Sequence, residues 1–110
     1  MKKVIEQLDK LVQTWASRQK SEISGQYGCV AHHIIGRANH YLRFDKENLF
    51  ICTNAEHNLI HNGILKVETY ISPKRLGNLR DKRIKSLLWK PTPDFYNNTL
   101  FVWKKRIGSK

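Results

Sequence analysis

Four histidines in the middle of the chain could hold a metal ion and move a proton. They form an adjacent pair, His32-His33, and a second pair, His57 and His61, four residues apart. Residues four apart on a helix share a face, so His57 and His61 are expected to point the same way. Two imidazoles one helical turn apart make a ready clamp for a metal ion.

The adjacent histidines need two different roles, because neighbouring side chains on a strand point to opposite faces. We expect His32 to be the third metal ligand and His33 to face the substrate as general base, since a neutral imidazole near pH 7 can take a proton from water. A metal on three neutral nitrogens could bind a phosphate oxygen and stabilise the charge that develops in phosphodiester cleavage. Asn48 offers an amide that could hold the loop positioning His33.

Two strands and a helix are expected to position these side chains. The run 29–35 is rich in β-branched residues and is bounded by glycines, which favours a strand, and the run 48–52 is also strand-like. Asn54 is a plausible N-cap for the helix that carries His57 and His61.

This part of the chain resembles the HNH endonucleases, whose fold is a β-hairpin and a helix wrapped around one metal ion. The residues that carry the resemblance are His32-His33-Ile34, Asn48-Leu49, Cys52 and His57-x-x-x-His61-Asn62-Gly63. Their order and spacing are similar to the three-histidine version found in nuclease colicins. The run Leu42-Arg43-Phe44-Asp45 is similar to NinG-type phage recombination nucleases. The resemblance covers residues 28–63.

The resemblance implies a role for each residue of the set. His33 would be the general base, Asn48 the structural asparagine, and the metal ligands would be His32, His57 and His61. The implied fold is α+β, a ββα-metal hairpin and helix packed among further helices. The implied activity is metal-dependent hydrolysis of duplex or branched DNA, in phage recombination or other DNA processing.

Two features differ from the HNH pattern. Many members brace the motif with a structural zinc on two Cys-x-x-Cys pairs, whereas this chain has only Cys29 and Cys52, so we expect no second zinc. Many members also carry Asp where this chain has His32, which favours magnesium. Three imidazoles instead suit zinc, nickel, cobalt or manganese, so the sequence leaves the identity of the metal open.

Other interpretations also fit these residues. Singly, each histidine suits an ordinary strand or helix position, and only their joint occurrence with Asn48 favours a nuclease site. Cys29, Cys52, His57 and His61 could form a structural zinc site, although the gap between the cysteines is too long for a zinc-finger knuckle. A non-catalytic nucleic-acid-binding module with a structural zinc, or an enzyme that cleaves RNA, could use the same residues.

The charge of the chain favours a polyanionic partner. Its 20 Lys and Arg against 9 Asp and Glu give a formal charge of +11, which attracts nucleic acid without reading its sequence. Residues 74–110 contain 11 basic and two acidic residues, so we expect this part of the chain to bind DNA. For any single lysine, the alternative is a position on a solvated helix face. His40 could also be a solvated loop residue. The expected nucleic-acid contacts are Arg37, His40, Arg43, Lys74, Arg75, Arg80, Lys82, Arg83 and Lys85.

The length of 110 residues suits one domain. We expect an N-terminal helix and loop over 1–27, the ββα motif over 28–63 and basic helices over 64–110. No apolar run approaches a membrane span, and the first residues are charged again too soon for a signal peptide. We therefore expect a cytoplasmic protein with reduced thiols.

Three further helices are predicted outside the motif. Apolar residues at helical spacing predict one over 3–19, and the pairs Ser72-Pro73 and Thr92-Pro93 predict starts for helices over 73–88 and 93–106. The expected core faces are Val4, Ile5, Leu8, Leu11, Val12 and Trp15 in the first, Leu76, Leu79, Ile84, Leu87 and Leu88 in the second, and Phe95, Tyr96, Leu100, Trp103 and Ile107 in the third.

Overall fold

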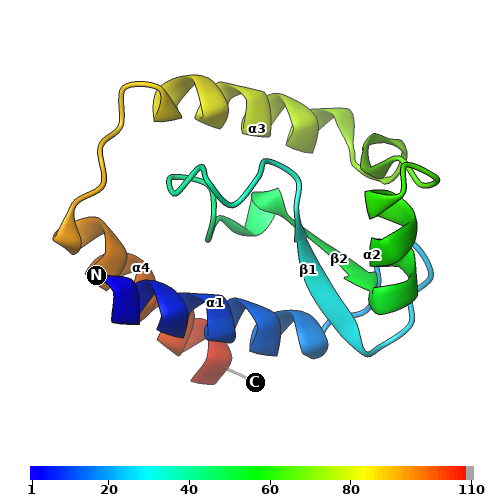
Figure 1. Cartoon of the computed structure of the whole chain (residues 1–110), viewed down its shortest axis with the longest axis horizontal. Helices are drawn as coiled ribbons and strands as arrows, with labels where there is room; N and C mark the ends of the chain where they lie inside the picture. Colours follow the sequence, from blue (N-terminus) through cyan, green and yellow to red (C-terminus); the bar gives the residue numbers. More distant parts are fainter. Residues whose placement is uncertain (109–110) are drawn as a thin grey trace.

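A two-stranded antiparallel hairpin lies among four α-helices in the computed structural model, which describes residues 1–108 (Figure 1). The elements in chain order are α1 (Lys2–Ser17), β1 (Cys29–His33), the 3₁₀ turn η1 (Lys46–Asn48), β2 (Leu49–Thr53), α2 (Asn54–His61), the 3₁₀ turn η2 (Val67–Tyr70), α3 (Pro73–Ser86) and α4 (Pro93–Gly108). The fold is therefore α+β, with a hairpin followed directly by a helix. In the described part of the chain, no helix has both the length and the hydropathy needed to cross a membrane.

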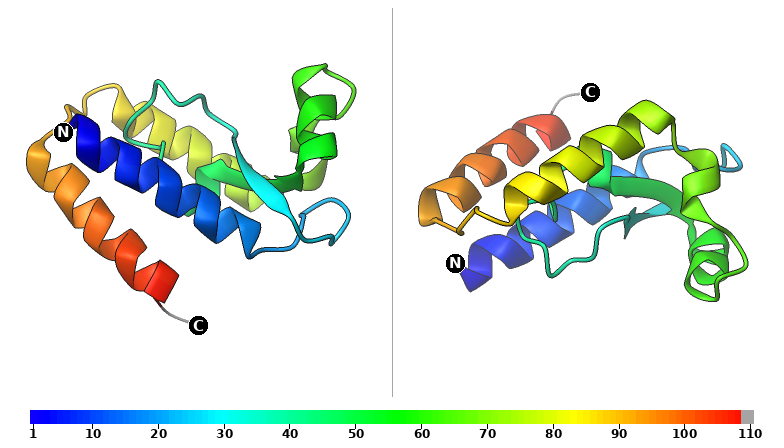
Figure 2. Two further views of the ribbon diagram at one scale, coloured as in Figure 1. Left: turned by 60° about the horizontal axis from the view of Figure 1, so that its bottom comes forward. Right: turned by 90° about the horizontal axis from the view of Figure 1, so that it is seen from above.

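The hairpin separates two apolar clusters, because successive side chains of a strand point to opposite faces. One face packs against α1 and α4 around Leu8 and Trp103. The other face packs around Phe50 against the segment that follows α2. Figure 2 shows α1 and α4 side by side, with α2 at the far end of the hairpin. The hairpin is thus supported on both faces.

Both outer edges of the hairpin are also covered by polar side chains. The backbone N–H of Ala31 donates to Gln13 of α1 over 3.2 Å. On the other edge, the backbone N–H of Glu22 donates to the carbonyl of Ile51, and the N–H of Ile51 donates to the Glu22 carboxylate, each over 2.8 Å. Arg75 of α3 also donates to a carbonyl of this strand. A lone two-stranded hairpin is marginally stable, so these contacts from α1 and α3 help to fix it.

The predicted elements are found with boundaries shifted by one or two residues. The three helices outside the motif run 2–17, 73–86 and 93–108, and the serine and threonine hydroxyls that precede α3 and α4 each accept a backbone N–H of the first turn. The first strand ends at His33 rather than reaching residue 35. Asn48 belongs to η1 and not to the second strand, which begins at Leu49.

The core face predicted for α3 is wrong at its C-terminal end. Leu79 is buried, but Ile84, Leu87 and Leu88 are 61%, 78% and 92% exposed. Instead, α3 is held by polar contacts, which include the ion pairs of Lys82 with Asp45 and Glu47. The helix also ends before Leu87, so the last two leucines do not continue its apolar stripe.

Candidate metal centre and cleft

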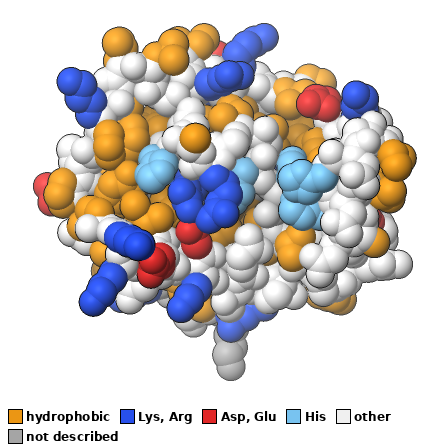
Figure 3. Space-filling model, in the orientation of Figure 1, with side chains coloured by type: hydrophobic (Ala, Val, Ile, Leu, Met, Phe, Trp, Pro, Cys, Tyr) orange, Lys and Arg blue, Asp and Glu red, His pale blue; other side chains and the backbone are white. Residues whose placement is uncertain are grey.

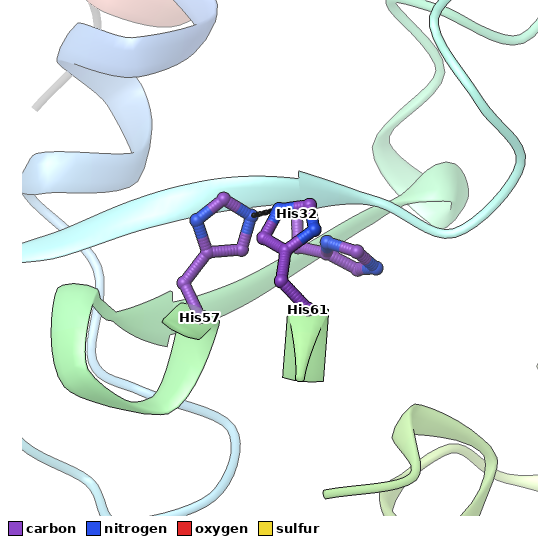
Figure 4. Close-up of side chains that lie close together, drawn as sticks. All are labelled: His32, His57 and His61. Atoms are coloured by element: carbon purple, nitrogen blue, oxygen red, sulfur yellow. Dashed lines mark hydrogen bonds between the residues drawn. The ribbon is translucent and has the colours of Figure 1, made fainter. Parts of the chain in front are cut away.

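Three histidines meet at the end of the hairpin where α2 lies beside β1 (Figure 4). One nitrogen from each of His32, His57 and His61 lies within 4.8 Å of the other two, and the Nε2 atoms of His57 and His61 are 3.0 Å apart. Nitrogens bound tetrahedrally to zinc at about 2.05 Å are roughly 3.3 Å apart. These three side chains are therefore close enough to bind one metal ion.

The start of α2 fixes where His57 lies. The Thr53 hydroxyl accepts the N–H of Glu56 at 3.2 Å, and the Glu56 carboxylate accepts the N–H of Thr53 at 2.8 Å, which is a capping box. The prediction of Asn54 as N-cap is wrong, since it is the first residue of the helix. Ser21 also donates to the Glu56 carboxylate at 2.6 Å, so the segment after α1 anchors the helix that carries two of the histidines.

Burial favours the neutral form of two of these imidazoles. Desolvation, followed by the charges of His57 and His61, lowers the pKa of His32 to about 4. Desolvation also lowers the pKa of His57, with a further contribution from His61. A neutral imidazole is the form that coordinates a metal, so few protons compete for these nitrogens at neutral pH.

His33 projects from the opposite face of β1, as the alternation of a strand requires. Its Nε2 lies 3.0 Å from the carbonyl oxygen of Arg43. A carbonyl only accepts, so Nε2 carries the proton and Nδ1 keeps its lone pair. Burial is the main cause that lowers the pKa of His33, which favours the neutral ring near pH 7. The ring is thus prepared to accept a proton at Nδ1.

Asn48 ties the end of β1 to the loop that follows it. Its side chain is fully buried. The Oδ1 atom accepts the N–H of Ile35 at 2.7 Å, and the Nδ2 group donates to the carbonyls of Ile35 and Leu42 at 2.9 and 3.1 Å. The side-chain amide of Asn48 thus holds the loop, which is the role predicted for it from the sequence. They fix the backbone on both sides of the loop next to His33.

One cleft of about 570 Å³ is open to both faces of β1. It is lined by Asp9, Val12 and Gln13 of α1, by Ala31, His32, His33, Gly36 and Arg37, and by His57 and His61 of α2. Figure 3 shows histidine and basic side chains exposed together on this side of the molecule. A ligand in the cleft can therefore contact the His33 side and the three-histidine cluster at once.

Comparison of this chain with protein-family models, curated proteins and solved structures gives no significant match. The residues of the cleft offer three nitrogens close enough together to bind one metal ion, a separate imidazole whose Nδ1 can accept a proton, and a nearby guanidinium.

The basic residues predicted to contact nucleic acid fall into two groups. Arg37 lines the cleft with a side chain that is 59% exposed, and four basic residues of α3 are exposed as well: Lys74, Arg80, Arg83 and Lys85. Arg37 also pairs with Asp9, and the other three pair with acidic residues while their side chains are less exposed. Arg43 pairs with Asp9, Arg75 with Glu22, and Lys82 with Asp45 and Glu47.

His40 is half-buried, so the interpretation of a solvated loop residue is wrong. Its Nδ1 lies 2.8 Å from the hydroxyl of Tyr96 on α4, and its Nε2 lies 3.5 Å from Arg43. Burial, and then the charge of Arg43, lowers the pKa of His40. His40 is therefore a contact between the loop and α4.

The two cysteines do not join the histidines in a metal site. Cys29 belongs to the cluster against α1, whereas Cys52 belongs to the cluster around Phe50 on the other face of the hairpin. Burial raises the pKa of both thiols, that of Cys52 to about 12. The zinc site of two cysteines and two histidines considered from the sequence is not formed.

Two polar residues of the cleft wall were not predicted from the sequence. Asp9 and Gln13 lie on α1, which the sequence assigned only to the core. Their partners, Arg37 and Arg43 for Asp9 and Ala31 for Gln13, lie 18 to 34 residues away along the chain. No local pattern marks such contacts.

Proposed function

We propose that this protein is a metal-dependent endonuclease of the HNH type that hydrolyses DNA. The observation that carries the proposal is one cleft with two kinds of imidazole, a neutral His33 on one face of β1 and the three-histidine cluster on the other. The order of elements agrees with a ββα-metal motif, since a hairpin leads directly into the helix that carries His57 and His61.

In the proposed mechanism His33 acts as the general base. Its Nε2–H is engaged by the Arg43 carbonyl, so Nδ1 would take the proton from a water molecule that attacks phosphorus. Attack forms the new P–O bond, and the bond to the leaving sugar oxygen breaks. Asn48 holds the loop beside His33, and so keeps the ring in place.

His32, His57 and His61 would hold the metal ion. Three imidazole donors are typical of zinc, nickel, cobalt or manganese sites, and they fit magnesium less well because it prefers oxygen ligands. When bound, the ion would supply a Lewis acid that stabilises negative charge on the phosphate and the leaving oxygen. The residues present fit such an ion because their nitrogens converge within 4.8 Å.

The charge distribution suits a nucleic-acid substrate. Arg37 lies in the cleft wall, and the exposed basic residues of α3 add to the overall charge of +11. Phosphate contacts of this kind supply affinity without sequence preference. Arg43, Arg75 and Lys82 contribute to the positive field but are committed to acidic partners within the protein.

Plasmid nicking tests the proposal. Wild-type protein and His57→Ala are incubated with supercoiled DNA in EDTA, and then with added manganese, nickel, zinc, cobalt or magnesium; an RNA of the same sequence serves as second substrate. We expect metal-restored DNA cleavage by wild type and none by the variant. If wild type binds DNA but cuts neither substrate with any metal, a non-catalytic binding module is the better description. Cleavage of RNA alone would reassign the substrate.

A further inference from the structure

Asp9 holds two arginines at the wall of the cleft. Its carboxylate accepts two hydrogen bonds from Arg43, at 3.1 Å from Nε and 2.6 Å from Nη2, and one from Nη2 of Arg37 at 3.1 Å. The two arginines differ in exposure, with side chains 14% exposed in Arg43 and 59% exposed in Arg37. One arginine is thus largely enclosed, while the other extends into the solvent of the cleft.

Arg43 and Asp9 restrain each other directly, and Arg37 is restrained through Asp9. Arg43 is held at its backbone by His33 and grips both oxygens of Asp9 through its guanidinium, so the plane of the carboxylate is set. The oriented carboxylate then restrains Arg37. An isolated ion pair on the surface rarely fixes an arginine, because two long side chains must lose their freedom. Here the acid is already immobilised before Arg37 binds it.

We propose that Asp9 is a positioning residue and that Arg37 is the phosphate-binding group that it positions. The proposal rests on the nuclease function proposed above, and it assigns to α1 a part in substrate binding. Arg37 uses one nitrogen for Asp9, and its remaining N–H groups are suited to bind a phosphate of the DNA backbone. It lines the same cleft as His33 and the three-histidine cluster, so that phosphate would be the scissile one or a close neighbour.

The direction in which one substitution changes DNA affinity distinguishes this proposal from an effect of net charge alone. Removing any acid from a protein with net charge +11 should strengthen its attraction for nucleic acid. The positioning role predicts the opposite for Asp9→Asn, because Arg37 loses the anion that holds it. Glu6→Gln is the matched control. Glu6 lies on α1 one turn before Asp9, is exposed, and has no ion pair within the described chain.

The experiment compares KM and kcat for DNA cleavage by wild type, Asp9→Asn, Glu6→Gln, Arg37→Ala and the double variant Asp9→Asn/Arg37→Ala. We expect KM to rise roughly 10-fold in Asp9→Asn and in Arg37→Ala, since one charge-assisted contact is lost in each. The double variant should be no worse in KM than Arg37→Ala, and Glu6→Gln should leave KM unchanged or lower it. An unchanged or lower KM in Asp9→Asn would overturn the proposal.

Measurements of DNA affinity in the absence of cleavage distinguish failure of this proposal from failure of the proposed nuclease function. Fluorescence anisotropy of a labelled oligonucleotide, in EDTA, should show the same order of affinities whether or not wild type cuts DNA. Thermal unfolding checks that each variant is folded. If Asp9→Asn does not fold, Arg37→Lys carries the test, because it keeps the charge and the Asp9–Arg43 pair but loses the guanidinium. Affinity equal to wild type in Arg37→Lys would refute the role of Arg37.

Discussion

Replacing Asn48 by alanine should lower the free energy of unfolding by about 3 kcal/mol. The side chain is fully buried and makes three hydrogen bonds, to the N–H and carbonyl of Ile35 and to the carbonyl of Leu42. Each such bond contributes about 1 kcal/mol net; alanine leaves the N–H and the carbonyl of Ile35 without this partner, whereas the Leu42 carbonyl keeps the N–H of Asp45 at 3.1 Å. For a domain of this size the loss corresponds to a fall of roughly 12 °C in Tm.

Urea unfolding followed by circular dichroism measures this loss. Asn97→Ala, on an exposed position of α4, is the control and should change stability by less than about 0.5 kcal/mol. Asn48→Asp keeps the shape of the side chain but turns a carboxylate oxygen toward two carbonyls, so it should be at least as damaging as alanine. A loss below about 1 kcal/mol in Asn48→Ala would show that the loop holds its conformation without the amide.

Three further outcomes are expected. Thr53→Ala removes the cap of α2 and should cost about 1 kcal/mol in urea unfolding, whereas Thr53→Ser should cost little; equal losses would argue against the cap. Hydrogen bonds from Lys82, and then from Asn78, lower the pKa of Glu47, so this carboxylate stabilises the fold above about pH 4.5 and the effect is lost as the pH falls further. Unfolding measured against pH should therefore show a smaller acid loss in Glu47→Gln, and identical profiles would contradict the pairing. Zinc at 100 times its Kd should stabilise wild type by about 2.7 kcal/mol, and the gain should disappear in His57→Ala.

Local spacing was enough to predict how the histidines of each pair are oriented, although it did not decide that His32 rather than His33 joins His57 and His61. A strand alternates its side chains, so His32 and His33 had to face opposite ways, and a helix brings residues four apart together, as in His57 and His61. The structure has the three nitrogens within 4.8 Å. Even there the exact start of the helix was missed, because threonine and asparagine are both good caps and only the reciprocal bond with Glu56 decides between them.

Contacts between distant segments could not be predicted. Asp9 meets Arg43 across 34 residues, and His40 meets Tyr96 across 56. Nothing in the sequence near either residue identifies such a partner. Helical spacing likewise predicted a core face for the end of α3, yet Leu88 is 92% exposed because the apolar stripe predicts burial only where another element is present to cover it.

The most direct test of the proposed nuclease is single-turnover DNA cleavage by His33→Ala and by the matched variant His40→Ala. Both variants lose a half-buried histidine near Arg43, but only His33 lines the cleft. Metal affinity is measured in parallel by calorimetry. We expect His33→Ala to lose at least about 100-fold in cleavage rate with metal affinity unchanged, as for loss of a general base, and His40→Ala to stay within about 10-fold of wild type. Full cleavage by His33→Ala would contradict the assignment of the base and, with it, the proposed mechanism.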